Sequence, residues 1–313
     1  MSRCQTVFAS LFTTWCFCNS APAQPFATGE AAYSKDSDGL LTNSLSVGIG
    51  IYTSEENFYD RIGYKRSAVN FVAPGFSMHG NSDSVFGAKI FSSPQGLIKG
   101  EAVLTSLSLP TWGGATIGSI QISGQPTQAV NYEIRSEKNI VDSVNSLIKR
   151  VTFSAQTLAA DYQFTPGLNI AGVLGSLNFS DQNRRALWKA KATYVLSEEY
   201  GIRTYLKVTR HTNSLPHTGN YFSPDNFRDY QAGVGFRRRL SMFRGVLSGY
   251  AEAGSQAADG VSTPVHGEQI RLEAFPNRPW HYDFSIGVQT SAGTGGGSNY
   301  VYRYAKGALV WPF

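Results

Sequence analysis

Long runs of alternating side chains constrain the fold of this chain more than any other feature of its sequence. In the clearest run, every second position is occupied by Trp280, Tyr282, Phe284, Ile286 and Val288, with polar or small residues between them. A period of two places the two sets on opposite faces of a β-strand. Strands in soluble proteins average about five or six residues, whereas a strand tilted across a bilayer needs about 9 to 11. The run is therefore typical of a strand that crosses a membrane.

The same alternation recurs along the chain, with turn signals such as Thr165-Pro166-Gly167 between the runs. The pattern predicts an all-β fold, a transmembrane antiparallel β-barrel of about 16 strands (about 14 to 18) over residues 45–313. Residues 24–44 are expected to form an N-terminal lead-in, with a plug or an extra strand as alternatives. The strands are expected to begin near Leu45, Phe58, Val69, Val85, Leu97, Ala115, Ala129, Val151, Leu168, Ala186, Ile202, Phe227, Phe243, His266, Trp280 and Tyr300.

Residues 1–23 have the features of a secretory signal peptide. Arg3 provides the positive start, residues 7–18 are mostly apolar, and Ala21-Pro22-Ala23 offers a cleavage site. A membrane anchor is the alternative, but the apolar stretch is too short to span a bilayer comfortably. All three cysteines lie in this segment. The mature chain is therefore expected to hold no disulfide, no cysteine metal site and no thiol nucleophile.

Composition and motifs give no indication of an enzyme or of a nucleic-acid-binding protein. The formal net charge of +5 is too small, and the basic residues too dispersed, to predict nucleic-acid binding. None of the five histidines lies in an H-E-x-x-H pattern, and neither a G-x-S-x-G motif nor a Walker loop is present. We therefore expect no catalysis, no metal and no cofactor.

The polar faces of the predicted strands point to a water-filled or polar lumen. Charges of both signs and several tyrosines share these faces. Such a wall suits the passage of a hydrated solute, and tyrosine rings can stack on sugars. The same groups could instead pair across the lumen and fill it, and both interpretations stay open. The predicted lumen-lining residues are Lys189, Lys191, Arg203, Tyr205, Lys207, Arg237, Tyr250, Glu252, Glu273 and Asp283.

The last residues of the chain form an alternating strand that closes with an aromatic residue. Leu309, Trp311 and Phe313 share one face. This arrangement resembles the C-terminal assembly signal of bacterial outer-membrane barrels; an ordinary edge strand is the alternative. The resemblance implies the bacterial outer membrane as location, and outer-membrane lipid and the barrel-assembly machinery as partners.

Several segments resemble the C-terminal barrel of bacterial exopolysaccharide-export porins, which serve cellulose and poly-N-acetylglucosamine secretion. The matching stretches are residues 141–143, 178–184, 219–225 and 302–303. The positions that carry the resemblance are Arg135, Asp142, Asp181, Asn183, Arg184, Tyr221 and Pro224. The resemblance implies a passive conduit for a polysaccharide, with periplasmic export proteins as further partners. The helical-repeat region of that family is missing, because the predicted strands begin soon after the signal peptide.

The sequence therefore predicts an outer-membrane, porin-like conduit for export of an exopolysaccharide. Three alternatives remain: a general porin for small solutes, a structural or adhesion barrel with a filled lumen, and an outer-membrane enzyme. An open pore in planar bilayers would be expected for the conduit and for the general porin. A filled barrel would be silent in the same measurement.

Overall fold

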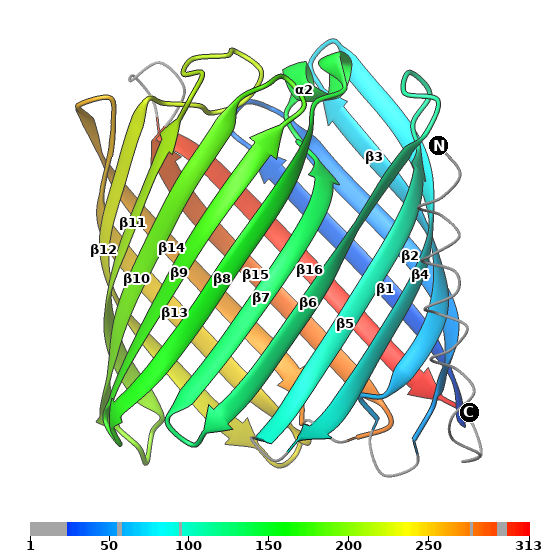
Figure 1. Cartoon of the computed structure of the whole chain (residues 1–313), viewed down its shortest axis with the longest axis vertical. Helices are drawn as coiled ribbons and strands as arrows, with labels where there is room; N and C mark the ends of the chain where they lie inside the picture. The colour runs from blue at the N-terminus through cyan, green and yellow to red at the C-terminus, as the bar shows by residue number, and fades with distance from the viewer. Residues whose placement is uncertain (1–23, 55–57, 94–95, 276–277, 293–298) are drawn as a thin grey trace.

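The structure is a computed structural model, and it describes residues 24–54, 58–93, 96–275, 278–292 and 299–313. These residues form one closed antiparallel β-barrel of sixteen strands (Figure 1), as the alternation predicts. The predicted signal peptide lies outside the described residues. The elements are β1 Gln24–Asp36, β2 Leu41–Tyr52, β3 Arg61–Ala73, β4 Phe76–Ser93, β5 Gly96–Ser108, β6 Ala115–Thr127, β7 Val130–Ile140, α2 Val144–Lys149, β8 Thr152–Thr165, β9 Leu168–Phe179, β10 Arg184–Ser197, β11 Ile202–Asn213, β12 Asn226–Leu240, β13 Gly245–Ala258, β14 Val261–Ala274, β15 His281–Ala292 and β16 Asn299–Pro312.

The first and last strands close the barrel. β1 pairs with β16 in an antiparallel register that runs from Phe26 opposite Pro312 to Asp36 opposite Tyr302. All other pairings join strands that are consecutive in the sequence. Closure leaves no open sheet edge, so that backbone N–H and C=O groups can pair within the sheet. A hydrocarbon environment requires such pairing.

The N-terminal boundary of the barrel differs from the prediction. Residues 24–44, expected to be a lead-in, form β1 and the start of β2, so the barrel begins at Gln24 rather than at residue 45. The strand start predicted at Val69 is also wrong, because Val69 lies inside β3. These two errors cancel in the strand count. The outward positions of β1 hold small residues such as Ala27, so its alternation is too weak to be recognised.

Side chains alternate between the two sides of the wall. On β2, Leu45 and Val47 are exposed on the outer side, while Ser46 between them is buried on the inner side. Contacts that skip one strand identify the inner side. The Tyr205 hydroxyl of β11 donates to Glu252 of β13, across β12. Such a contact requires the concave side of the wall, where side chains from next-but-one strands converge. Apolar side chains therefore face outward and mostly polar ones inward.

The two rims of the barrel differ in their connections. One rim, called the α2 rim below, carries residues 141–151 with α2 and residues 214–225 between β11 and β12 (Figure 1). The opposite rim includes short turns such as residues 128–129. α2 follows Ser143, whose side chain accepts a hydrogen bond from an N–H of the first turn and so caps the helix. Among the described residues, no helix has the length and apolarity needed to cross a membrane.

Candidate conduit: the inner wall and the α2 rim

The inner wall between β10 and β15 carries the side chains that the sequence assigned to the lumen. In the strand registers, all of these positions have the same parity as Tyr205 and Glu252, which meet on the concave side. The structure brings most of them together in two clusters. Lys189, Arg203 and Tyr250 lie on the same wall outside these clusters.

The first cluster surrounds Glu252. One carboxylate oxygen accepts a hydrogen bond from Tyr205 at 2.8 Å, and the other pairs with the Lys207 ammonium group at 2.7 Å. The Lys191 ammonium group lies 3.8 Å from the centroid of the Tyr205 ring. Glu252 is buried, and a buried carboxylate needs such partners to remain charged. Four of the predicted residues therefore form one polar unit on the wall.

The second cluster surrounds Arg271, a residue that the sequence analysis missed. Its guanidinium group binds both oxygens of Asp283, at 2.9 and 2.6 Å, and lies 3.1 Å from Glu273. Arg237 also pairs with Glu273, at 3.3 Å. Arg271 links the three predicted residues because a guanidinium group can bind two carboxylates at once. Its inward parity, shared with Glu273 on the same strand, could have revealed it.

Glycines let inner tyrosine rings lie against the wall. A Cβ atom on Gly233 would stand 2.4 Å from the Tyr205 ring, and one on Gly287 would stand 2.6 Å from the Tyr304 hydroxyl. Each ring therefore lies over a glycine of the neighbouring strand and reaches the strand beyond. The Tyr304 hydroxyl donates to Gln269 in this way, at 2.7 Å. The Tyr304 ring is half-buried and borders the lumen, whereas the Tyr205 ring is buried between Gly233 and the Lys191 ammonium group.

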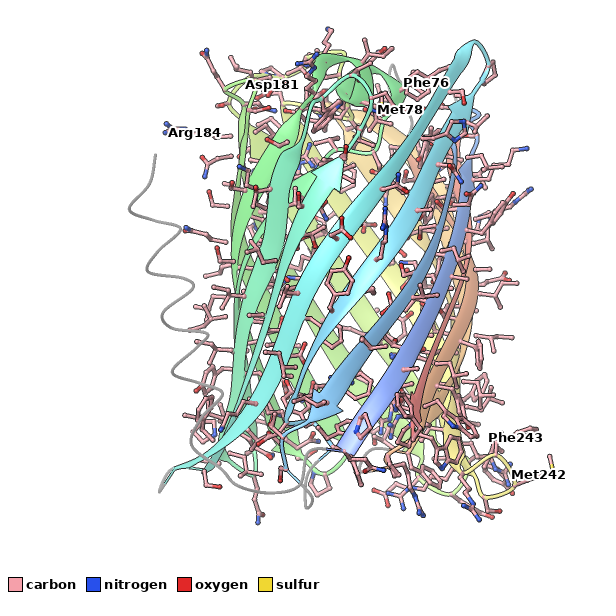
Figure 2. All side chains as sticks on the ribbon, turned by 90° about the vertical axis from the view of Figure 1, so that its right-hand side faces the viewer. Phe76, Met78, Asp181, Arg184, Met242 and Phe243 are labelled. Carbon is pink, nitrogen blue, oxygen red and sulfur yellow. The ribbon has the colours of Figure 1, made fainter. Side chains whose placement is uncertain are left out.

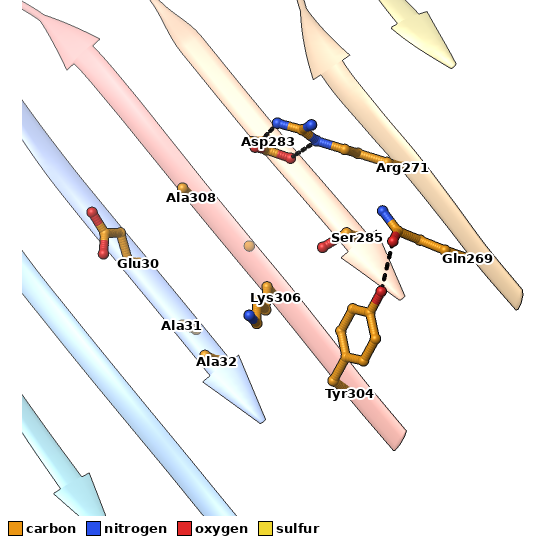
Figure 3. Close-up of a pocket in the computed structure, with 11 residues that line it drawn as sticks. Glu30, Ala31, Ala32, Gln269, Arg271, Asp283, Ser285, Tyr304, Lys306 and Ala308 are labelled. Carbon is orange, nitrogen blue, oxygen red and sulfur yellow. Dashed lines mark hydrogen bonds and ion pairs between the residues drawn. The ribbon is translucent and has the colours of Figure 1, made fainter. Parts of the chain in front are cut away.

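A recess of about 400 Å³ opens in the wall beside Tyr304. Figure 3 shows Tyr304 bonded to Gln269 and Arg271 bonded to Asp283 along its edge. Lys306 also lines the recess, and its ammonium group lies 5.6 Å from the centroid of the Tyr304 ring. An aromatic face beside amide, ammonium and carboxylate groups can contact both the apolar face and the hydroxyls of a sugar.

On β3 to β5, the inward-facing residues close to the α2 rim are apolar. Leu147 of α2 is fully buried against Phe71, Met78 and Leu107 from the inner faces of β3, β4 and β5. The indole N–H of Trp112 donates to the Leu147 carbonyl at 2.9 Å. α2 is therefore seated inside the mouth of the barrel and covers part of it. The sequence pattern predicts a strand start near Val151 and does not indicate this helix.

The β11–β12 segment, residues 214–225, meets α2 through Asn220. The backbone carbonyl of Asn220 accepts hydrogen bonds from the side chains of Ser143 and Ser146, the latter at 2.9 Å. Its side-chain oxygen accepts from Lys149 at 2.8 Å. Two loops that are distant in the sequence therefore form one roof over part of the mouth. We call this unit, residues 141–151 and 214–225, the mouth roof.

The positions that carry the family resemblance converge in part at the mouth roof. The Tyr221 hydroxyl accepts from Asn183 at 3.0 Å and donates to Asp181 at 3.1 Å, and its ring stacks on Phe179 at 4.4 Å. Asp181 also accepts from the Asn220 side chain, at 2.9 Å. Burial raises the pKa of Tyr221 to about 12, so its hydroxyl remains a donor at neutral pH.

Of the other resemblance positions, Pro224 joins this network through Asn213, whereas the side chains of Arg135, Asp142 and Arg184 lie apart from it. Arg135 pairs with Glu137 on the inner face of β7, at 2.7 Å. Asp142 precedes the α2 cap and is exposed. Pro224 contributes its carbonyl to Asn213. Figure 2 shows Arg184 pointing away from the outer surface near the α2 rim, so it does not contribute to the mouth.

The three C-terminal residues assigned to the assembly signal point outward. Leu309, Trp311 and Phe313 are all exposed on the outer face, and the Phe313 N–H donates to the Pro25 carbonyl of β1 at 3.1 Å. This placement puts the three side chains where lipid would contact them. Their role in assembly stays a prediction.

Comparisons with solved structures find the same fold. A chain described as a bacterial polysaccharide outer membrane secretin matches with a TM-score of 0.66 at 13% identity, covering 92% of this chain and 98% of that chain. CdiB from Acinetobacter baumannii matches with a TM-score of 0.50 at 10% identity, covering 93% of this chain but 60% of that chain. No protein-family model and no curated protein matches the sequence.

These findings define the class of protein. The chain forms a closed sixteen-stranded barrel, and its structural neighbours are barrels of outer-membrane proteins. Identities this low establish the fold alone. Within the described part of the chain, no group of three or more histidine, cysteine, aspartate or glutamate residues is placed to hold a metal ion.

Proposed function

We propose that this protein is an outer-membrane conduit through which a polysaccharide passes. One observation carries the proposal: on the inner wall, the half-buried Tyr304 ring lies against Gly287 and is flanked by the Gln269 amide and the Lys306 ammonium group. This combination suits sugars, because ring faces contact their apolar faces and polar groups contact their hydroxyls. The likeness in fold to a polysaccharide secretin and the sequence resemblance to export porins support the same substrate class.

The lengths of the connections give the orientation. Barrels of the outer membrane have short turns on the periplasmic side and longer loops on the extracellular side. The longer connections of this barrel, residues 141–151 and 214–225, are both at the α2 rim. The α2 rim is accordingly assigned to the cell exterior, and the mouth roof covers part of the exit.

Single-channel recording tests the proposal. The folded protein is inserted into planar bilayers, and neutral, anionic and cationic oligosaccharides are added in turn. We expect an open channel whose current is interrupted by at least one class of oligosaccharide. Replacement of the ring in Tyr304→Ala should shorten these interruptions by about tenfold, corresponding to a loss of about 1.4 kcal/mol of binding free energy.

Tyr194→Ala provides the matched control, because Tyr194 is exposed on the outer face of β10 and cannot meet a solute in the lumen. The current interruptions of the Tyr194→Ala channel should last as long as those of the unmodified protein. An open channel that no oligosaccharide interrupts would support a general porin for small solutes instead. Lys189 and Arg203 on the inner wall form no ion pair with any residue that the structure describes, and they favour this second candidate because they would attract small ions. A silent barrel would contradict both.

A further inference from the structure

Three arginines face outward near the α2 rim, one each on β10, β11 and β12. Arg210 and Arg228 stand directly opposite each other on neighbouring strands. Arg184 lies at the start of β10, and Figure 2 shows it pointing away from the wall. The outward parity of Arg210 follows from its register partner Trp188, which is exposed on the outer face.

None of the three guanidinium groups forms an ion pair or a hydrogen bond with any other residue that the structure describes. Like charges directly opposite each other on neighbouring strands are destabilising. Arg210 and Arg228 are therefore an unfavourable pair in the isolated barrel. An anion bound between them would remove the repulsion.

The apolar band next to these arginines gives their depth. On β12, Arg228 and Arg238 enclose the outward stretch Tyr230, Ala232, Val234 and Phe236. The distance between the two arginines is about 33 Å along the strand, at about 3.3 Å per residue. A strand tilt of about 40° reduces it to about 25 Å across the membrane, the height of the apolar band of outer-membrane barrels. Arg228 and Arg210 therefore lie at the depth of the lipid headgroups.

We propose that Arg184, Arg210 and Arg228 bind the phosphate groups of an anionic lipid of the outer leaflet. A guanidinium group binds phosphate oxygens with two parallel hydrogen bonds, and clustered basic residues beside an apolar surface recognise anionic headgroups. Trp188 and Tyr230 continue the patch toward the apolar band, where the acyl chains lie. Because the basic residues adjoin an apolar surface, the patch favours a lipid, which has both a phosphate and acyl chains, over free phosphate. The inference rests on the membrane location proposed above.

Native mass spectrometry of the barrel in detergent tests the inference with diphosphorylated lipid A as the probe. Relative to the unmodified protein, Arg210→Gln with Arg228→Gln should weaken binding by about tenfold or more, since each lost phosphate contact is a charge-assisted one. Arg238→Gln is the matched control, because Arg238 lies on the same face of β12 at the opposite boundary. The affinity of the Arg238→Gln variant for lipid A should equal that of the unmodified protein. Should the double variant not fold, Arg210→Gln alone replaces it, with a decrease of about threefold.

Two results would overturn the inference. One is equal binding of the lipid by the double variant and the unmodified protein. The other is displacement of the lipid by millimolar inorganic phosphate, which would show that the apolar part contributes nothing. The channel recordings described above report on the inner wall, which these outward substitutions leave unaltered. Failure of the lipid site and failure of the conduit are therefore distinguishable.

Discussion

Inward-facing strand positions carry different side chains at the mouth of the barrel and in the rest of the inner wall, which we call the shaft. At the α2 rim the inner positions of β3 to β5 hold Phe71, Met78 and Leu107, which form a small apolar core with Leu147 of α2. Further down the wall, inner positions hold glycine, tyrosine and charged residues, such as Gly233 and Glu252. The apolar positions hold a helix over the lumen, whereas the polar positions pair with one another along the wall.

This difference shows how strand parity and strand depth act together. Parity decides whether a side chain faces the lumen or the lipid, and depth decides which chemistry that side chain needs. A large apolar residue facing a water-filled lumen would be exposed, so it is stable there only when a loop covers it. Substitutions at the mouth and in the shaft separate the two regions.

Leu147→Ala should release the mouth roof without unfolding the barrel. Removal of a fully buried leucine costs about 2–5 kcal/mol, and the loss falls on the packing of α2. Trypsin cleavage after the exposed Lys149 or Arg150 of the folded barrel should accelerate by at least about tenfold. Single-channel conductance should rise in the same variant because the mouth widens.

Leu206→Ala is the control for this substitution, because Leu206 is 65% exposed on the outer face of β11. Its trypsin cleavage and conductance should match those of the unmodified protein. A difference in gel migration between the unboiled and the boiled sample reports whether each variant is still a folded barrel. Unchanged cleavage of Leu147→Ala would contradict the proposed role of the apolar core in holding the roof.

Gly233→Ala should narrow the shaft while leaving the mouth unaltered. The new methyl group would overlap the Tyr205 ring, which then has to turn into the lumen and loses its hydrogen bond to Glu252. Glu252 keeps Lys207 as a partner, so the stability loss should be modest, about 1 kcal/mol. Conductance should fall, and trypsin cleavage of the roof should not change.

Two further variants sharpen this prediction. Removal of the ring in the double variant Gly233→Ala with Tyr205→Ala should restore or exceed the original conductance. Gly29→Ala is the control, since a Cβ atom at Gly29 meets no atom within 4 Å. If Gly233→Ala conducts like the unmodified protein, the glycine does not serve to keep the ring against the wall.

The sequence predicted the barrel and the faces of its longer strands, because lipid and lumen impose a strict period of two. It failed where that period weakens. β1 carries small outward residues. β4 begins at Phe76, whereas its start was predicted near Val85, because the polar residues Ser77 and His79 at its first outward positions hide the alternation. Polar outward side chains are tolerated there since that end of β4 lies near the α2 rim, beyond the apolar band.

The mouth roof was harder to predict for a different reason. Its contacts join β9–β10, α2 and the β11–β12 segment, and no local pattern encodes that meeting. The family resemblance selected Asp181, Asn183 and Tyr221, which do meet. Asn220 lies in the matching stretch 219–225 but was not selected, although its backbone carbonyl and side chain make the link to α2. Arg271 was missed on the shaft although its parity was available. Contacts between distant segments therefore required the structure.

Tyr221→Phe should loosen the mouth roof least, because it removes one hydroxyl and keeps the ring. The stack on Phe179 remains, whereas the hydrogen bonds with Asp181 and Asn183 are lost, at a cost of about 1 kcal/mol. Trypsin cleavage after Lys149 should accelerate by about fivefold, less than in Leu147→Ala.

The pH dependence of this effect distinguishes the hydroxyl from the ring. Burial raises the pKa of Tyr221 from 10.0 to about 12, so the neutral form is the one that the folded roof favours. The stabilisation is therefore fully present below the ordinary pKa of tyrosine and is lost as the pH rises toward the folded value. The difference in cleavage rate between the unmodified protein and Tyr221→Phe should stay constant from pH about 7 to 9 and shrink above about 11. A difference that already vanishes near neutral pH would mean that the hydroxyl does not hold the roof to the β9–β10 turn, and that the apolar seat of α2 alone does so.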